Sequence, residues 1–190
     1  MFLAFLQELL ERPRAVGAVC SSSRRLAECM TRHLDLSRGG PVLELGAGTG
    51  AITEELLRGG VRADQLVVLE QSDRFVRHLR HRFPGVHVVC GDACEADRLL
   101  HRLGPFDAVV SGLPLRSLHD TAVSRITEAC CRLLAADGKL LQFTYALTMQ
   151  SPWLREEVQR VASQRVLLNF PPARVDVFRR IVRASPEPPG

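Results

Sequence analysis

Apolar and amphipathic segments alternate along the chain from residue 41 to about residue 145. Short apolar runs predict strands, and the amphipathic segments between them predict helices. The expected strands are Val42–Leu45, Leu66–Glu70, Val86–Cys90, Ala108–Ser111 and Leu140–Tyr145. The expected helices are Ala51–Arg58, Ser72–Phe83, roughly Glu95–Leu103, and Asp120–Ala135. Because the strands are apolar throughout and alternate with helices, this pattern predicts an α/β fold, a parallel sheet with helices on both faces.

The C-terminal part of the chain is expected to extend this sheet. A helix is expected near Leu154–Val161, followed by strands at about Val166–Phe170 and Val175–Val182. With these strands the expected sheet is seven-stranded and mostly parallel, and residues 37–184 form one domain. Residues 185–190, S-P-E-P-P-G, are expected to be a disordered tail.

Residues 1–36 are expected to form N-terminal helices that cap the membrane or substrate side of the domain. In M-F-L-A-F-L-Q-E-L-L-E-R, Phe2, Leu6 and Leu9 share an apolar face opposite a polar one. Pro13 ends this amphipathic helix. Its apolar face either docks on the sheet or lies in a membrane interface. A second helix is expected to bury Leu26, Ala27, Met30 and Leu34.

The composition, with 46% hydrophobic and 24% charged residues, is typical of a globular protein. The formal net charge of +4 is compatible with nucleic acid, with an anionic membrane surface, or with neither. The N-terminus lacks the basic region of a secretory signal, and no apolar stretch is long enough to span a bilayer. The six cysteines form no C-x-x-C pair and no paired Cys/His spacing, so no metal site is expected.

Candidate chemistry begins at V-L-E-L-G-A-G-T-G, residues 42–50, where three glycines separate an expected strand from a helix. Glycines at this position allow a tight turn and let a ligand approach the backbone closely. Glu70 ends the next expected strand, about twenty residues on, where a carboxylate can accept hydrogen bonds from both hydroxyls of a ribose. Asp92 follows the third strand and is placed to accept a hydrogen bond from the amine of an adenine. All three sites lie at the carboxyl ends of strands, where open α/β sheets bind ligands.

A dinucleotide is one candidate ligand, because Gly46-x-Gly48-x-x-Ala51 fits a loose nicotinamide-cofactor fingerprint. Glu44 argues against it, since a carboxylate just before the first glycine would lie close to a pyrophosphate of the same charge. The chain is also short for a dinucleotide-binding half plus a substrate-binding half. A ligand with a cationic centre and no phosphate fits better.

Several spaced motifs then point to a family: E-L-G-A-G-T-G at 44–50, Glu70, G-D-A at 91–93 and F-D-A-V-V-S at 106–111. Through them the chain resembles the class I S-adenosylmethionine-dependent methyltransferases over about residues 40–145. The resemblance implies a Rossmann-like fold, S-adenosyl-L-methionine as cofactor, S-adenosyl-L-homocysteine as product, and no metal ion. The residues that it implies for cofactor binding are Glu44, Gly46, Ala47, Gly48, Gly50, Glu70, Gln71, Gly91, Asp92, Ala93 and Ser111.

The residues after the fourth expected strand, V-V-S-G-L-P-L at 109–115, would contact the methyl acceptor in this class. Enzymes that methylate amines of DNA and RNA carry Asn/Asp-Pro-Pro-Tyr or Asn-Leu-Pro-Tyr there. Here Gly112 replaces the polar residue and Leu115 replaces the aromatic residue that stacks on a base. Because a flipped base needs such a platform, nucleic acid is not the expected partner.

Four further segments extend the comparison to nearly the whole chain: R-P-R-A-V-G-A-V-C-S-S-S-R-R-L-A at 12–27, V-V-S-G-L-P-L at 109–115, Q-F-T-Y at 142–145 and N-F-P-P-A at 169–173. Through these segments the chain resembles the small bacterial phospholipid N-methyltransferases. The resemblance implies methylation of phosphatidylethanolamine toward phosphatidylcholine, by a cytoplasmic protein that is peripheral on the inner face of the cell membrane. Its expected partner is an anionic phospholipid surface. Residues expected to meet lipid are Phe2, Leu6, Leu9, Leu113, Pro114 and Leu115.

Methyl transfer from a sulfonium needs mainly alignment and exclusion of water. Ser111, Gly112 and Tyr145 are expected to position the acceptor, and the proton of the amine leaves to Tyr145, His119, Asp120 or water.

Three alternatives stay open. The leucines of residues 112–115, called the acceptor loop below, can fold back onto the core. The chain can also be an enzyme like the ribosomal RNA adenine N6-dimethyltransferases. It can also be a non-catalytic, methyltransferase-like module that binds lipid or protein. The sequence leaves the oligomeric state open.

Overall fold

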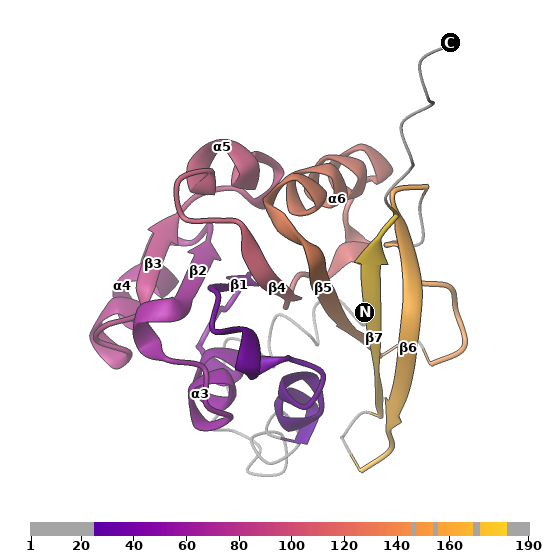
Figure 1. The fold of residues 1–190 in the computed structure, drawn as a ribbon, viewed down its shortest axis with the longest axis horizontal. Coiled ribbons are helices and arrows are strands. Elements are labelled where there is room, and N and C mark those ends of the chain that lie inside the picture. Colours follow the sequence, from indigo (N-terminus) through magenta and orange to yellow (C-terminus); the bar gives the residue numbers. More distant parts are fainter. Residues whose placement is uncertain (1–24, 146, 154–155, 169–171, 182–190) are drawn as a thin grey trace, which may run out of the picture.

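The structure is a computed structural model that describes residues 25–145, 147–153, 156–168 and 172–181. A seven-stranded sheet with strand order β3-β2-β1-β4-β5-β7-β6 runs through the described part (Figure 1). The strands are β1 (Val42–Leu45), β2 (Leu66–Glu70), β3 (His87–Cys90), β4 (Phe106–Ser111), β5 (Leu134–Thr144), β6 (Val158–Val166) and β7 (Ala173–Arg180). Strands β1 to β5 pair in parallel, and β7 pairs antiparallel with both β5 and β6. The predicted seven-stranded, mostly parallel sheet is therefore confirmed.

Helices cover both faces of the sheet, as predicted (Figure 1). Helices α3 (Ala51–Arg58) and α4 (Asp73–Arg82) share one core cluster with the helix over residues 25–31. Helices α5 (Ala96–Leu100) and α6 (Asp120–Leu133) share the other. Single turns of 3-10 helix connect these elements: η1 (Leu36–Arg38), η2 (Ala63–Gln65), η3 (Ala93–Glu95) and η4 (Leu115–Ser117).

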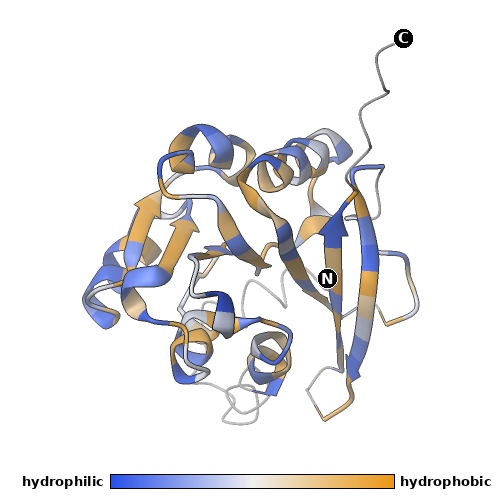
Figure 2. Ribbon diagram, in the orientation of Figure 1, coloured by the Kyte–Doolittle hydropathy of each residue, from blue (hydrophilic) through white to orange (hydrophobic). Residues whose placement is uncertain are grey.

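Side-chain alternation explains why the central strands are apolar along their whole length. In β2, Val68 packs in the cluster on the α3 side of the sheet, and its neighbours Val67 and Leu69 pack on the α5 side. In β1, Val42 and Leu43 divide in the same way. Every residue of these strands is buried, since successive side chains point to opposite covered faces. Figure 2 accordingly shows the central strands as mostly apolar.

The helix over residues 25–31 buries Leu26, Ala27 and Met30, as predicted from its periodicity, whereas Leu34 lies beyond the helix and is only partly buried. Leu26 and Met30 share a cluster with Val42 and Leu56, so this helix is continuous with the core of the domain. The predicted amphipathic helix and the predicted C-terminal tail lie outside the described residues. Within the described part, no helix is long and apolar enough to cross a membrane.

Two expected element boundaries are wrong where helix α6 meets strand β5. The helix ends at Leu133 instead of Ala135, and β5 starts at Leu134 instead of Leu140. Leu134 pairs with Phe106 of β4 and is buried with it, so tertiary packing overrides the helix propensity of the two alanines that follow. A Cβ at Gly138 would lie 3.0 Å from the Phe106 carbonyl oxygen, so glycine allows this close strand pairing.

The expected helix near Leu154–Val161 is also wrong from Val158 onward, because strand β6 covers Val158–Val166. For the same reason the strand expected at Val166–Phe170 lies too far along the chain. Strand β6 is an edge strand that pairs only with β7, and most of its residues are exposed. Val158, Ala162 and Val166 pack against the core clusters, but they lie four residues apart, so no alternation with a period of two reveals the strand.

Candidate functional site

The candidate site lies at the carboxyl ends of the central parallel strands. Strand pairing places Leu45 beside both Leu69 and Ser111, and Ser111 beside Gln142. The glycine loop that follows β1, Glu70 at the end of β2, and the loop that follows β4 therefore meet at one edge of the sheet. The sequence prediction that these motifs gather at a single edge is correct.

The three glycines of the loop have left-handed backbone conformations, with φ of 70° at Gly46, 55° at Gly48 and 83° at Gly50. A Cβ at Gly46 would lie 2.6 Å from the Leu113 side chain, and one at Gly50 would lie 2.4 Å from the Phe83 ring. No atom would lie within 4 Å of a Cβ at Gly48. The outer glycines thus allow tight packing, and Gly48 faces the open space through which a ligand can approach the backbone.

Glu70 joins strand β2 to the glycine loop and is buried. Its carboxylate accepts hydrogen bonds from the Gly48 and Ser72 backbone N–H groups, both at 2.9 Å. A carboxylate has about four acceptor positions, so Glu70 can also accept hydroxyl hydrogen bonds. Asp92 is exposed after β3, and one of its oxygens accepts a hydrogen bond from the Cys94 N–H at 2.8 Å.

Glu44 is fully buried on the α3 side of the loop. The Thr53 hydroxyl donates to Oε2 of Glu44 at 2.7 Å, and Oε1 of Glu44 has no hydrogen-bond partner among the residues that the structure describes. Burial raises the pKa of Glu44 to about 8; the Thr53 hydrogen bonds oppose this shift and the charge of Glu70 adds to it. Glu44 is therefore mostly protonated at pH 7. A nearby cation would stabilise the ionised form of this carboxyl. The unpartnered oxygen of Glu44 therefore fits a cationic ligand such as S-adenosylmethionine.

Gly112 and Ser111 pack against the glycine loop. The Gly112 N–H donates to the Leu45 carbonyl at 2.8 Å, and a Cβ at Gly112 would lie 2.7 Å from the Gly46 carbonyl oxygen. Ser111 is fully buried, and its hydroxyl accepts a hydrogen bond from the Leu113 N–H at 3.3 Å. Both residues shape the end of β4, and their role toward an acceptor stays a prediction.

The sequence predicts that Leu115 contacts lipid, and this prediction is wrong because the side chain is buried. Its side chain is 3% exposed and shares a core cluster with residues of α6. The alternative, in which this leucine folds back onto the core, is correct for Leu115. Pro114 is exposed and Leu113 is half-buried, so these two residues supply the accessible apolar surface of the loop.

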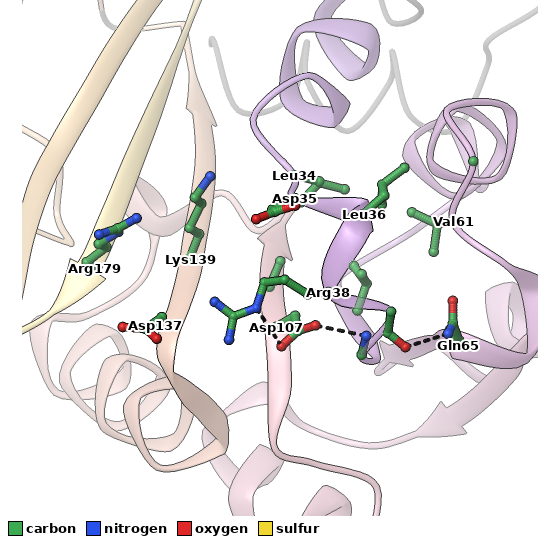
Figure 3. A pocket seen from close by; sticks show the side chains of 15 residues that line it. Leu34, Asp35, Leu36, Arg38, Val61, Gln65, Asp107, Asp137, Lys139 and Arg179 are labelled. Atoms are coloured by element: carbon green, nitrogen blue, oxygen red, sulfur yellow. Dashed lines mark hydrogen bonds and ion pairs between the residues drawn. The ribbon is translucent and has the colours of Figure 1, made fainter.

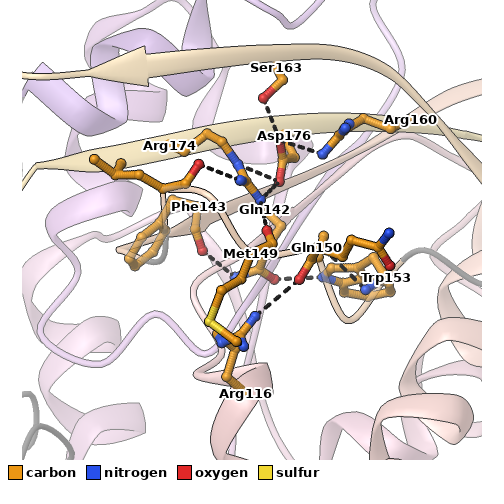
Figure 4. Close-up of polar contacts among 12 residues, drawn as sticks. Arg116, Gln142, Phe143, Met149, Gln150, Trp153, Arg160, Ser163, Arg174 and Asp176 are labelled. Atoms are coloured by element: carbon orange, nitrogen blue, oxygen red, sulfur yellow. Dashed lines mark hydrogen bonds and ion pairs between the residues drawn. The ribbon is translucent and has the colours of Figure 1, made fainter.

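A buried polar network holds the acceptor loop against the loop that follows β5 (Figure 4). The Gln142 amide donates to the Leu113 carbonyl at 3.1 Å and accepts from the Trp153 indole N–H at 2.7 Å. The buried Arg174 guanidinium donates to the Leu147 and Met149 carbonyls at 2.7 and 2.9 Å. It also forms an ion pair with the fully buried Asp176 at 2.8 Å.

Sequence reasoning gave no role to Gln142, Arg174 or Asp176. One signal was present: Gln142 interrupts the apolar run L-L-Q-F, and Asp176 interrupts V-D-V-F. A polar residue at a buried strand position must find a partner, because an unpaired polar group in a core is costly. Such interruptions predict a network, although they do not identify its members.

The other predicted site residues have different surroundings. Tyr145 follows β5, is half-buried, and packs edge-on against Phe143 with ring centroids 5.7 Å apart. His119 and Asp120 are exposed at the start of α6. Phe2, Leu6 and Leu9 lie outside the described residues, so their membrane role stays a prediction. Among the residues that the structure describes, no group of three or more histidines, cysteines and carboxylates could hold a metal ion.

A separate pocket lies at the amino ends of the strands (Figure 3). Arg38 and Asp107 form an ion pair there at 3.3 Å, and the Lys139 ammonium donates to the His33 carbonyl at 2.9 Å. Three basic and three acidic residues line this pocket, so its formal charges balance: Arg38, Lys139, Arg179, Asp35, Asp107 and Asp137. None of the predicted site residues lines it.

The chain is similar to known methyltransferases in both sequence and fold. The methyltransferase domain family matches residues 42–138. The chain is 30% identical over 177 residues to the ornithine lipid N-methyltransferase of Singulisphaera acidiphila, and the match covers 90% of this chain and 89% of that relative. A probable ribosomal RNA small subunit methyltransferase A of Methanosarcina acetivorans is 34% identical over 131 residues, with 67% of this chain and 44% of that protein covered.

The fold resembles that of a methyltransferase solved with its product. The N-methyltransferase NodS of Bradyrhizobium japonicum, in complex with S-adenosyl-L-homocysteine, matches with a TM-score of 0.64 and 19% identity, over 82% of this chain and 86% of that one. At this identity the likeness concerns the fold alone. The family match and the full-length relative carry the assignment: the chain belongs to the methyltransferase domain family of class I S-adenosylmethionine-dependent methyltransferases.

Proposed function

We propose that this enzyme methylates the headgroup amine of phosphatidylethanolamine and its methylated intermediates, toward phosphatidylcholine. The observation that carries the proposal is the similarity to a lipid N-methyltransferase along 90% of this chain and 89% of that relative. The matched RNA methyltransferase supports an RNA acceptor less well, because the chain spans only 44% of its length. In this proposal the enzyme is a peripheral protein at the inner face of the cell membrane, where it meets its lipid acceptor.

The proposed cofactor is S-adenosyl-L-methionine, which supplies a methyl group on a cationic sulfur when bound. The open backbone at Gly48 gives a ligand close access, and the adjacent Glu70 carboxylate can accept ribose hydroxyl hydrogen bonds. Glu44 supports a cationic ligand through its buried, unpartnered oxygen. The remaining proposed cofactor contacts are Gly46, Ala47, Gly50, Gln71, Gly91, Asp92, Ala93 and Ser111.

The acceptor loop favours a lipid amine over a nucleobase. Its accessible residues, Leu113 and Pro114, are apolar and offer no aromatic surface on which a base could stack. They can contact the apolar neck of a lipid, and Tyr145 lies at the same edge, after strand β5. Gln142 fixes the position of the loop through the Leu113 carbonyl. We propose that these groups align the amine and exclude water, since alignment supplies much of the rate enhancement in such transfers.

Methyl transfer from labelled S-adenosylmethionine tests the proposal directly. The full chain would be incubated with vesicles that contain phosphatidylethanolamine, with vesicles that contain ornithine lipid, and with small-subunit ribosomal RNA. We expect label in phosphatidylethanolamine and its methylated products, identified by mass spectrometry, and none with the Gly48→Val variant. Label in ornithine lipid alone would reassign the lipid, and label in RNA alone would refute a lipid acceptor. Cofactor binding without transfer to any acceptor would favour a non-catalytic module.

A further inference from the structure

Large apolar side chains are exposed at the same edge of the sheet as the candidate site. Among the described residues, the three most exposed large hydrophobic side chains are Leu168 at 77%, Leu167 at 65% and Met149 at 54%. They come from two loops: Leu167 and Leu168 lie in the turn after β6, and Met149 lies in the loop after β5. These three residues are called the carboxyl-edge rim below.

Strand pairing fixes where the turn after β6 lies. Val166, the last residue of β6, pairs with Ala173, and the next residue of β7, Arg174, pairs with Thr144 at the end of β5. Strands β5 and β6 therefore end at the same side of the sheet, where β7 begins (Figure 1). Figure 2 shows apolar residues in this turn. Because β7 alone separates β6 from β5, the turn lies about 10 Å sideways from the end of β5.

Hydrogen bonds hold Met149 at the surface. The Arg116 guanidinium donates to the Gln150 carbonyl at 3.0 Å and to the Met149 sulfur at 2.9 Å, and Arg174 donates to the Met149 carbonyl (Figure 4). Arg116 follows the acceptor loop directly in sequence. The exposed methionine is thus fixed relative to the acceptor loop, and its exposure is built into the fold.

The sequence around the rim is basic, although Glu70 and Asp92 lie farther along the same edge of the sheet. The three segments 112–119, 145–153 and 165–172 together contain two arginines, Arg116 and Arg165, and no aspartate or glutamate. Arg116 and Arg165 are both exposed beside the rim. An apolar rim flanked by cations matches the interface of a phospholipid bilayer, where acyl chains lie beneath anionic phosphates.

We propose that the carboxyl-edge rim of Met149, Leu167 and Leu168 inserts into the interface of a phospholipid bilayer, with Arg116 and Arg165 against the lipid phosphates. This inference rests on the proposed function, and it explains how an amine that stays in the bilayer reaches the acceptor loop. Insertion of the rim turns the carboxyl edge of the sheet toward the membrane. Headgroups then enter the site from the side on which Leu113 and Pro114 are accessible.

The test compares two double variants of the full chain. Leu167→Ser with Leu168→Ser removes the most exposed part of the rim. Val161→Ser with Ile181→Ser is the matched control, because these side chains are 48% and 39% exposed outside the rim. Binding to vesicles of equal parts phosphatidylethanolamine and phosphatidylglycerol is measured by sedimentation. We expect the rim variant to bind at least about ten-fold more weakly than wild type, as the loss of two buried leucines implies, and the control variant to bind as wild type does.

Binding is measured without turnover, so it separates this inference from the identity of the methyl acceptor. If phosphatidylethanolamine is not methylated but the rim variant loses vesicle binding, only the proposed function fails. Unchanged vesicle binding by the rim variant, or no binding by wild type, overturns the inference. Light scattering supplies a further readout. A wild-type dimer that the rim variant converts to a monomer would show that a second copy covers the rim, which also overturns the inference.

Discussion

Replacement of Glu44 by glutamine should remove a large pH dependence of stability. Glu44 is fully buried, and burial raises its pKa to about 8 from a reference value of 4.5. Between these two values the unfolded chain has released its proton and the folded protein has kept it. The folded protein then binds more protons, so the free energy of unfolding falls as the pH rises. Glutamine has a similar shape and does not titrate.

The size of the effect follows from the two pKa values. At about 1.4 kcal/mol for each pH unit between 4.5 and 8, ionisation of Glu44 destabilises the wild type by about 5 kcal/mol in total. The loss begins above pH 4.5 and is complete above pH 8. The free energy of unfolding of the Glu44→Gln variant should therefore rise by the same amount relative to that of wild type between pH 4.5 and pH 8. Other titrating groups contribute equally to both proteins and cancel.

Urea unfolding of both proteins at several pH values between 4 and 9 measures this difference. Glu128→Gln is the matched control, because the Glu128 side chain is 50% exposed and its ion pair with Arg132 is at 3.7 Å. The control should differ from wild type by less than about 1 kcal/mol at every pH. A difference between Glu44→Gln and wild type that stays constant with pH would refute a protonated, buried Glu44.

A second readout links Glu44 to the proposed cofactor. A bound cation should favour the ionised carboxylate, so cofactor binding at pH 7 should release a proton from the wild type. Calorimetric titrations in buffers of different ionisation enthalpy count that proton. The Glu44→Gln variant should release none. Equal proton release from both proteins would show that the cationic sulfur of the cofactor does not bind near Glu44.

The remaining predictions concern the cofactor loop, the polar network and the core. Gly48→Val should abolish S-adenosylmethionine binding in calorimetry, since it fills the open approach and strains a φ of 55°; Glu70→Ala should weaken binding by about 1.5–3 kcal/mol per lost hydrogen bond. Circular dichroism should show both proteins folded, and unchanged binding isotherms would refute the loop assignment. Gln142→Leu leaves the Leu113 carbonyl and the Trp153 indole without their partner, so it should cost about 1–3 kcal/mol in urea unfolding and lower kcat. Cofactor affinity should stay as in wild type, and loss of cofactor affinity alone would contradict this role. Leu115→Asp should destabilise the protein by about 4 kcal/mol or more in thermal unfolding, because it buries a carboxylate in the core; a normal Tm would mean that this side chain is exposed.

Burial on both faces decides how well the sequence predicted each strand. Strands β1 and β2 begin and end at the predicted residues, because every position in them is covered and therefore apolar. Strand β6 was predicted too far along the chain, because most of its residues are exposed and carry no signal with a period of two. The cofactor edge was predictable, since glycines and acids at strand ends are local features. The partner of Glu44 on α3 and the burial of Leu115 depend on tertiary packing, which no local pattern encodes.

The strand order sets when the sheet can be completed during synthesis. Strand β7 lies between β5 and β6 in the sheet, although it follows both along the chain, and it is the strand to which β6 pairs. Until Ala173–Arg180 has left the ribosome, β6 has no place in the sheet and the long strand β5 presents an open edge. Open edges are sites of intermolecular strand pairing, so the nascent chain is most exposed to misassembly between the synthesis of β5 and the emergence of β7. A stop codon before residue 173 would remove one strand from the sequence and two from the sheet.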